Sequence, residues 1–145
     1  MERIALFPGS FNPFTIGHAN IVSRALKMFD KVIIGIGINC EKPQDNITEN
    51  LKEIETKYAD EPRVKVITYS TLTADVVEKE NATCIIRGIR NDVDLKYESE
   101  IAQVNYTLFK VETVFLLASP ELKEISSSIV RELQKFGKNI TDLLP

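Results

Sequence analysis

The residues best suited to chemistry lie around His18, the single histidine of the chain. His18 ends the segment 7–18, which holds two glycines and two prolines. An apolar run precedes this segment and a helical pattern follows it, so we expect a turn from a strand into a helix. Such a turn presents backbone N–H groups and the positive end of a helix, which suit an anion. The sequence therefore predicts phosphate chemistry at His18; capping or packing at the helix start is the alternative.

Arg87 and Arg90 form a second candidate group, because they flank Gly88 directly after an apolar run. Guanidinium groups bind phosphates through forked hydrogen bonds, and the end of a strand holds them rigidly. Two solvated arginines in a turn are the alternative. Asp94 and Glu98 follow in the next helical pattern, where a carboxylate could orient the arginines, accept from a ribose hydroxyl or lie on a solvated face.

A run of three serines and one lysine complete the polar candidates. Ser126, Ser127 and Ser128 stand where the last clear helical pattern begins. Their hydroxyl and backbone groups suit a polyphosphate, and capping of the helix is the alternative. Lys42 follows the second apolar run and could reach a phosphate as a flexible point charge; otherwise it is a surface lysine.

Length and composition narrow the class of protein. A chain of 145 residues with 43% hydrophobic and 27% charged residues predicts one domain, residues 1–145. No apolar run approaches the roughly 20 residues of a membrane helix, and no basic-then-apolar leader opens the chain, so we expect a cytoplasmic protein without membrane contact. The net charge of −3 argues against binding of nucleic acid.

The two cysteines and several missing motifs exclude other chemistries. Cys40 and Cys84 have no metal-like or redox-like spacing, and Cys84 lies in an apolar run typical of a buried strand. With one histidine and no cysteine cluster, we expect no transition-metal site. The Walker A phosphate loop and the dinucleotide fingerprint are both absent, and no second histidine completes an acyl-transfer triad.

Strand-like and helix-like segments alternate along the whole chain. The strands are expected at 3–7, 32–38, 64–68, 83–87 and 113–117, mostly as continuous apolar runs typical of strands covered on both faces. The helices are expected at 17–29, 48–58, 73–80, 95–109 and 127–135. The alternation predicts an α/β fold with a doubly wound, five-stranded parallel sheet in the order 3-2-1-4-5, Rossmann-like, with helices on both faces.

This topology brings the candidates together. Open parallel sheets bind ligands beyond the carboxyl ends of their strands, where the strand order reverses. That point lies between the first strand, which runs into the loop of His18, and the fourth, which runs into Arg87 and Arg90. One helical face at 97–108 is apolar, and Asn105 lies beside it as a polar residue without an evident reason.

Three segments together resemble the nucleotidyltransferase superfamily that carries a Thr/His-x-Gly-His loop, here Thr15-Ile16-Gly17-His18. Within it, segments 8–18, 87–105 and 125–132 are most similar to the bacterial phosphopantetheine adenylyltransferase family. The resemblance implies transfer of AMP from ATP to 4′-phosphopantetheine, giving dephospho-coenzyme A and pyrophosphate. It further implies Mg²⁺ bound mainly through the ATP phosphates, coenzyme A as a feedback ligand, and a homohexamer.

The resemblance also assigns roles to residues. It places Ser10, His18 and Lys42 at the reacting phosphorus and Arg90 on the leaving phosphates. The phosphate of phosphopantetheine is expected at Ser10, Lys42 and Arg87, and its arm along Leu72, Thr73, Ile101, Asn105 and Glu132. ATP is expected to contact Ser10, Phe11, His18, Gly88, Ile89, Arg90, Glu98, Leu122, Lys123, Glu124, Ile125, Ser126, Ser127 and Ser128.

The sequence departs from the family pattern in three places. Asn12 replaces the usual aspartate, the region 41–48 is shortened, and 122–124 lacks the customary tryptophan. Two other functions are alternatives. One is a sister nucleotidyltransferase that uses nicotinate mononucleotide or glycerol 3-phosphate, which the segment 87–105 disfavours. The other is a non-catalytic nucleotide-binding module, which would not need the whole set of Ser10, His18, Lys42 and Arg90.

Overall fold

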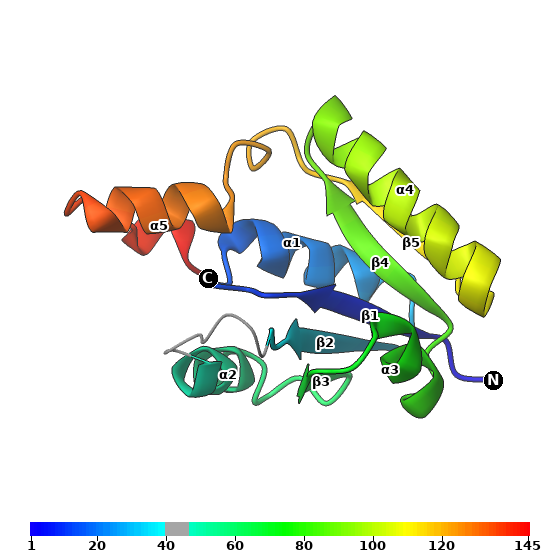
Figure 1. Cartoon of the computed structure of the whole chain (residues 1–145). Helices are drawn as coiled ribbons and strands as arrows, with labels where there is room; N and C mark the ends of the chain where they lie inside the picture. The colour runs from blue at the N-terminus through cyan, green and yellow to red at the C-terminus, as the bar shows by residue number, and fades with distance from the viewer. Residues whose placement is uncertain (40–46) are drawn as a thin grey trace.

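The computed structural model describes residues 1–39 and 47–145. Its parallel sheet has the order β3-β2-β1-β4-β5 with helices on both faces (Figure 1), which confirms the predicted fold. The strands are β1 (Ile4–Gly9), β2 (Lys31–Gly37), β3 (Val64–Tyr69), β4 (Cys84–Ile89) and β5 (Thr113–Leu117). The helices are α1 (Ile16–Ala25), α2 (Ile47–Lys57), α3 (Thr73–Lys79), α4 (Asp92–Phe109), α5 (Ser127–Lys135) and the 3₁₀ helix η1 (Thr141–Leu143).

Each face of the sheet has its own hydrophobic core. Side chains alternate along a strand, so Ala5 and Phe7 of β1 face α1 and α2, whereas Ile4 and Leu6 face α3. Neighbouring β2 divides in the same way and is almost fully buried between Val32 and Ile36. This burial on both faces is the physical reason why the strands read as continuous apolar runs.

The sheet opens on one side of β1. β1 pairs with β2 from Ile4 to Gly9, but it pairs with β4 only at Ala5 and Leu6. Beyond these residues β4 diverges from β1 and rises toward α4, as Figure 1 shows. The carboxyl ends of β1 and β4 are therefore separated at the predicted point where the strand order reverses, and the site lies there.

The observed boundaries correct one expectation about the arginines. The strand predicted to end at Arg87 continues to Ile89, so Gly88 lies inside β4 and Arg90 alone follows it. The strand continues because Arg87 shares the face of Ile85 by alternation and finds its polar partners on that face. Helix α4 begins earlier than predicted, because the side chain of Asn91 accepts from the backbone N–H of Asp94 and caps it.

The predicted apolar face of α4 does not lie on the sheet. Tyr97, Val104 and Leu108 are between 53% and 66% exposed, and Glu98 is the one buried residue of this helix. An exposed apolar helix face of this size is typical of a surface that another protein covers.

In the described part of the chain, no helix has the length and apolar character to cross a membrane.

Candidate active site

The histidine loop, residues 10–15, joins β1 to α1 and is fixed to the helix by His18. The side chain of Thr15 accepts from the backbone N–H of His18, and the backbone N–H of Thr15 donates to Nδ1 of His18 at 2.9 Å. This is a capping box in which histidine takes the place that glutamate or glutamine usually holds. The capping alternative weighed for His18 is therefore confirmed, and it leaves the second ring nitrogen available.

The surroundings of His18 keep its imidazole neutral. Burial, and to a smaller extent the positive charges of Arg87 and Arg90, lower the pKa of His18 from 6.5 to about 4. Because Nδ1 accepts the Thr15 N–H, the proton of the neutral ring resides on Nε2. His18 consequently offers one N–H donor at neutral pH and carries no charge.

Aromatic rings hold the imidazole in place. Phe14 stacks on it at 5.4 Å between ring centroids, and Phe11 meets it edge-on at 5.0 Å. Gly9 is needed for this arrangement, because a Cβ at that position would lie 3.0 Å from the ring of Phe11. The orientation of His18 is thus set by packing as well as by its bond to Thr15.

Arg87 bridges the gap between the diverging strands β1 and β4. Its guanidinium donates to both carboxylate oxygens of Glu98 on α4, at 2.9 and 2.7 Å, and to the carbonyl of Pro8 on β1. The Glu98 side chain is 9% exposed and the Arg87 side chain 31%. The prediction that a carboxylate of α4 orients an arginine is confirmed, and Arg87 lies between the two halves of the site.

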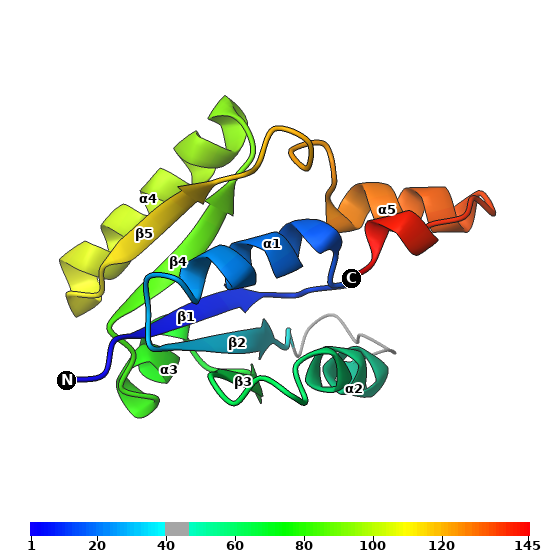
Figure 2. The same cartoon turned by 180° about the vertical axis from the view of Figure 1, so that it is seen from behind.

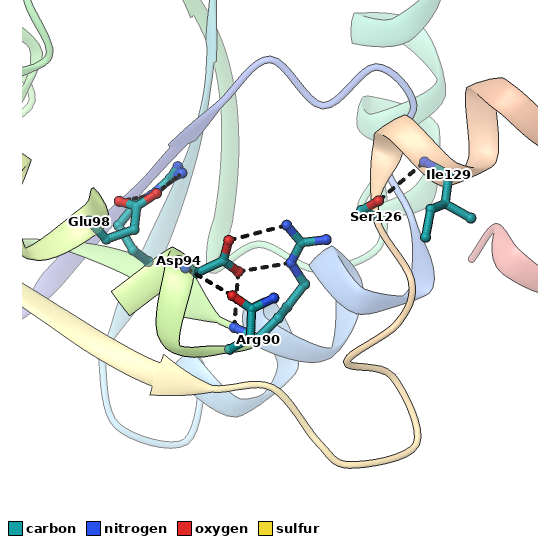
Figure 3. Close-up of polar contacts among 7 residues, drawn as sticks. Arg90, Asp94, Glu98, Ser126 and Ile129 are labelled. Carbon is teal, nitrogen blue, oxygen red and sulfur yellow. Dashed lines mark hydrogen bonds and ion pairs between the residues drawn. The ribbon is translucent and has the colours of Figure 1, made fainter. Parts of the chain in front are cut away.

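Arg90 is held by a second carboxylate of α4 (Figure 3). Asp94 accepts from the backbone N–H of Arg90 at 3.1 Å and from its guanidinium at 3.0 and 3.4 Å. Arg90 and Asp94 are four residues apart and both are partly exposed. Arg87 therefore reaches the site from β4 and Arg90 from the position directly after it. Each is positioned by its own carboxylate of α4, and the two carboxylates lie about one helical turn apart.

The three serines have different local partners. Ser126 caps α5 by accepting from the backbone N–H of Ile129 at 3.2 Å (Figure 3), so the capping alternative holds for this residue. Ser127 donates to the carbonyl of Pro13 at 2.7 Å, and Ser128 accepts from Arg131 at 3.2 Å. The start of α5 is therefore bonded directly to the histidine loop, which lies far from it in sequence.

These elements surround a pocket of about 320 Å³, the larger of the two pockets at the carboxyl ends of β1 and β4, called the larger pocket below. Among the described residues, three cationic side chains, those of Arg87, Arg90 and Arg131, line it together with His18, and no lysine does. This concentration of positive charge suits a polyphosphate. Of the residues predicted to contact ATP, the larger pocket brings together Ser10, Phe11, His18, Gly88, Arg90, Glu98, Leu122, Ile125, Ser126, Ser127 and Ser128.

Three residues predicted to contact ATP do not line that pocket. The side chain of Ile89 is buried in the core, and Lys123 and Glu124 are exposed on the segment before α5. A packing reason also emerges for Gly88, because a Cβ there would lie 3.3 Å from Ile21 of α1. Gly88 therefore allows α1 to pack closely against β4 as well as lining the pocket.

A smaller pocket of about 220 Å³ lies between α3 and α4. Of the residues predicted for the phosphopantetheine arm, Thr73, Ile101 and Asn105 line it, so the polar Asn105 faces a cavity. Arg87, predicted for the phosphate, lines it as well. Pro8, Gly9, Arg87 and Glu98 line both pockets, which therefore meet at the Arg87–Glu98 pair.

Two further residues predicted for the phosphopantetheine arm do not line the smaller pocket. Leu72 is 58% exposed and does not line it. Glu132 is exposed on α5, which lies on the other side of the molecule from α4 (Figures 1 and 2). Lys42 falls outside the described residues, so its role stays a prediction.

The structure also reveals site residues that the sequence predictions omitted. Asn20 and Ser119 line the larger pocket and are joined by a hydrogen bond of 3.2 Å. Arg131 lines it too, and donates to the carbonyl of Asn12 at 2.5 Å.

Asn50 of α2 was also omitted. It is 5% exposed and donates to the carbonyl of Ser10 at 3.2 Å. Asn50 shares an apolar stripe with Ile54, four residues on, and a polar residue in such a stripe is the signal that could have revealed it.

Comparison with known proteins agrees with this geometry. Residues 6–133 match the model of the cytidylyltransferase-like family. This match defines the class of protein. The parallel sheet, with the histidine loop at the point where the strand order reverses, agrees with that class.

Curated relatives narrow the class. The phosphopantetheine adenylyltransferase of Phocaeicola vulgatus is 51% identical over 144 residues, which are 99% of this chain and 95% of the relative. Those of Porphyromonas gingivalis and Flavobacterium johnsoniae are 50% and 45% identical, with the same two coverages. The chain therefore belongs to the phosphopantetheine adenylyltransferase family.

Proposed function

We propose that this chain transfers the adenylyl group of ATP to 4′-phosphopantetheine, which yields dephospho-coenzyme A and pyrophosphate. The observation that carries the proposal is the meeting of two pockets at one arginine. The larger, with its arginines and serines, suits ATP. The smaller, with Asn105 beside the apolar Ile101 and Ala102, suits the arm of phosphopantetheine. An acceptor phosphate bound at Arg87 then lies beside the ATP pocket.

The mechanism rests on positioning and on stabilisation of charge. An oxygen of the acceptor phosphate attacks the α-phosphorus of ATP in line. The bond from that phosphorus to the β-phosphate oxygen breaks, and its electron pair leaves with pyrophosphate. The Nε2–H of His18 and the hydroxyl of Ser10 donate to the oxygens of the reacting phosphorus, while Arg90 and the serines at the start of α5 hold the leaving phosphates. We also assign Lys42 to the reacting phosphorus.

Mg²⁺ fits this site as a companion of ATP. In the described part of the chain no group of three or more His, Cys, Asp and Glu side chains is placed to hold a metal. The two carboxylates that line the larger pocket, Asp94 and Glu98, are bonded to arginines. We therefore assign the metal to the triphosphate, where it neutralises part of the charge, as is common for Mg²⁺.

A panel of acceptors tests the function. Purified protein with ATP and Mg²⁺ is expected to release pyrophosphate when 4′-phosphopantetheine is present, and much more slowly with nicotinate mononucleotide or glycerol 3-phosphate. Coenzyme A, which carries both halves of the product, is expected to inhibit by competition. Release with nicotinate mononucleotide alone would assign the chain to a sister activity, and tight ATP binding without release for any acceptor would make it a binding module.

We further propose that residues 1–145 act as one cytoplasmic nucleotidyltransferase domain and assemble into a homohexamer. The support for assembly is the exposed apolar face of α4, with Tyr97, Val104 and Leu108, beside Leu117 of β5, which is 68% exposed. Sedimentation equilibrium is expected to give six times the mass of the chain. Leu108→Glu is expected to lower that mass, whereas Lys57→Glu on α2 leaves it unchanged; a monomeric wild type contradicts the proposal.

A further inference from the structure

Asn50 is a buried polar residue that lines neither pocket. Among the described residues, the other buried polar side chains are Thr15 and Glu98, and both already have a place in the site. The amide of Asn50 donates from α2 to the carbonyl of Ser10 at 3.2 Å. Burial of a polar side chain is costly unless its hydrogen bonds are made, so this contact calls for a physical explanation.

The histidine loop is tied to its surroundings through its carbonyl oxygens. Those of Ser10, Asn12 and Pro13 accept from Asn50, Arg131 and Ser127, which come from α2 and α5. The loop thus receives its conformation from elements on both sides of it.

The bond from Asn50 fixes the peptide that joins Ser10 to Phe11. In a planar trans peptide the C=O and N–H groups point in opposite directions. Because the Ser10 carbonyl points to α2, the N–H of Phe11 points away from α2. This N–H has no partner among the residues that the structure describes, and Phe11 lines the larger pocket.

Phe11 needs outside support for its backbone conformation. Its φ is +47°, in the left-handed region that non-glycine residues rarely adopt and that costs about 1 to 3 kcal/mol. The ring is 2% exposed and meets His18 edge-on, so a change in this backbone would also move the surroundings of the imidazole. The hydrogen bond to Asn50 acts on the carbonyl directly before Phe11, where it can oppose relaxation.

We propose that Asn50 is a positioning residue, which holds the Ser10–Phe11 peptide so that the Ser10 hydroxyl and the Phe11 N–H are directed at the phosphates of ATP. The inference rests on the proposed adenylyl transfer for its kinetic consequence, though not for its geometry. Asn50 acts through the histidine loop and does not itself touch a substrate.

Asn50→Leu tests this assignment, because leucine has the same branched arrangement of heavy atoms but no donor. Replacing a buried amide by an apolar group near Ile54 is expected to leave the melting temperature unchanged or higher, since the exposed Ser10 can give its carbonyl to water. We expect kcat to fall by about 10- to 100-fold with a change of only a few-fold in KM for ATP. A purely structural role predicts the opposite, with activity following stability.

Two companions make the test decisive. Asn50→Gln keeps a carboxamide donor and is expected to recover part of kcat, and Glu53→Gln on the exposed face of α2 serves as the matched control with wild-type kinetics. A crystal structure of Asn50→Leu gives a readout without turnover, in which the Ser10–Phe11 peptide should be rotated. An unrotated peptide, or wild-type kcat in Asn50→Leu, overturns the proposal. Lack of activity in the wild type with a rotated peptide instead overturns the proposed function alone.

Discussion

Replacing His18 by asparagine is expected to lower kcat by about 100- to 1000-fold and to leave the chain folded, since loss of one transition-state donor typically has this effect. The asparagine Oδ1 takes the place of Nδ1 and can still accept the Thr15 N–H, a bond of 2.9 Å in the wild type. It has no group in the place of Nε2. His18→Ala is expected to lose kcat to a similar degree and, in addition, about 1 kcal/mol of stability from the capping box.

Steady-state kinetics of the two variants, together with their thermal unfolding, check this prediction. ATP affinity measured by calorimetry should change little in either variant, because the donor acts mainly on charge that develops during the reaction. A His18→Asn enzyme with nearly wild-type kcat would show that His18 serves only to cap α1.

The pH dependence of His18→Asn provides a second comparison. The pKa of His18 is about 4, so the imidazole is neutral from pH 8 down to pH 5 and should lose its role only on further acidification. Since kcat/KM reports groups of the free enzyme, its profile should show no step near pH 6.5 that belongs to His18. ATP itself titrates in this pH range, and it does so equally with the wild type and with His18→Asn. The difference between the two profiles is therefore the contribution of His18. A step near pH 6.5 in the wild type that vanishes in His18→Asn would contradict a neutral His18.

The sheet could be predicted because strands that are buried on both faces have continuous apolar sequences. Val32, Ile33 and Ile34 are all nearly inaccessible, so no alternation of polar and apolar residues remains and the run can be recognised as a parallel strand. Once five such runs alternate with helices, the strand order and its reversal point follow from general rules of topology. Those rules place His18 and Arg87 at one crevice from the sequence alone.

Other features of the site depend on contacts distant in sequence. Arg87 continues β4 because Glu98 and the Pro8 carbonyl satisfy its guanidinium, and neither partner can be read from the strand itself. The left-handed backbone of Phe11 contradicts its local preference and persists because its ring is packed in the core. Asn50 and Arg131 were missed for the same reason, since their partners are backbone carbonyls and no motif marks them.

Removing Arg87 is expected to have a structural and a functional consequence that one experiment can separate. Arg87→Met leaves the Glu98 carboxylate, 9% exposed, without its cation. We expect a loss of about 2 to 3 kcal/mol of unfolding free energy, below the range for fully buried pairs because Arg87 is partly solvated. The kcat/KM for 4′-phosphopantetheine should fall by about 100-fold or more, because the forked donors for its phosphate are gone.

The double variant Arg87→Met with Glu98→Leu distinguishes the two effects. Removing both charges leaves no unpaired carboxylate, so stability should return to within about 1 kcal/mol of the wild type. Turnover should remain low, because methionine offers no donor to a phosphate. Arg63→Met, which removes an exposed arginine paired with Glu61, is the matched control and should change neither quantity appreciably. If the double variant regained both stability and kcat/KM, Arg87 would serve only to join β4, α4 and the Pro8 carbonyl, and the acceptor phosphate would have to bind elsewhere.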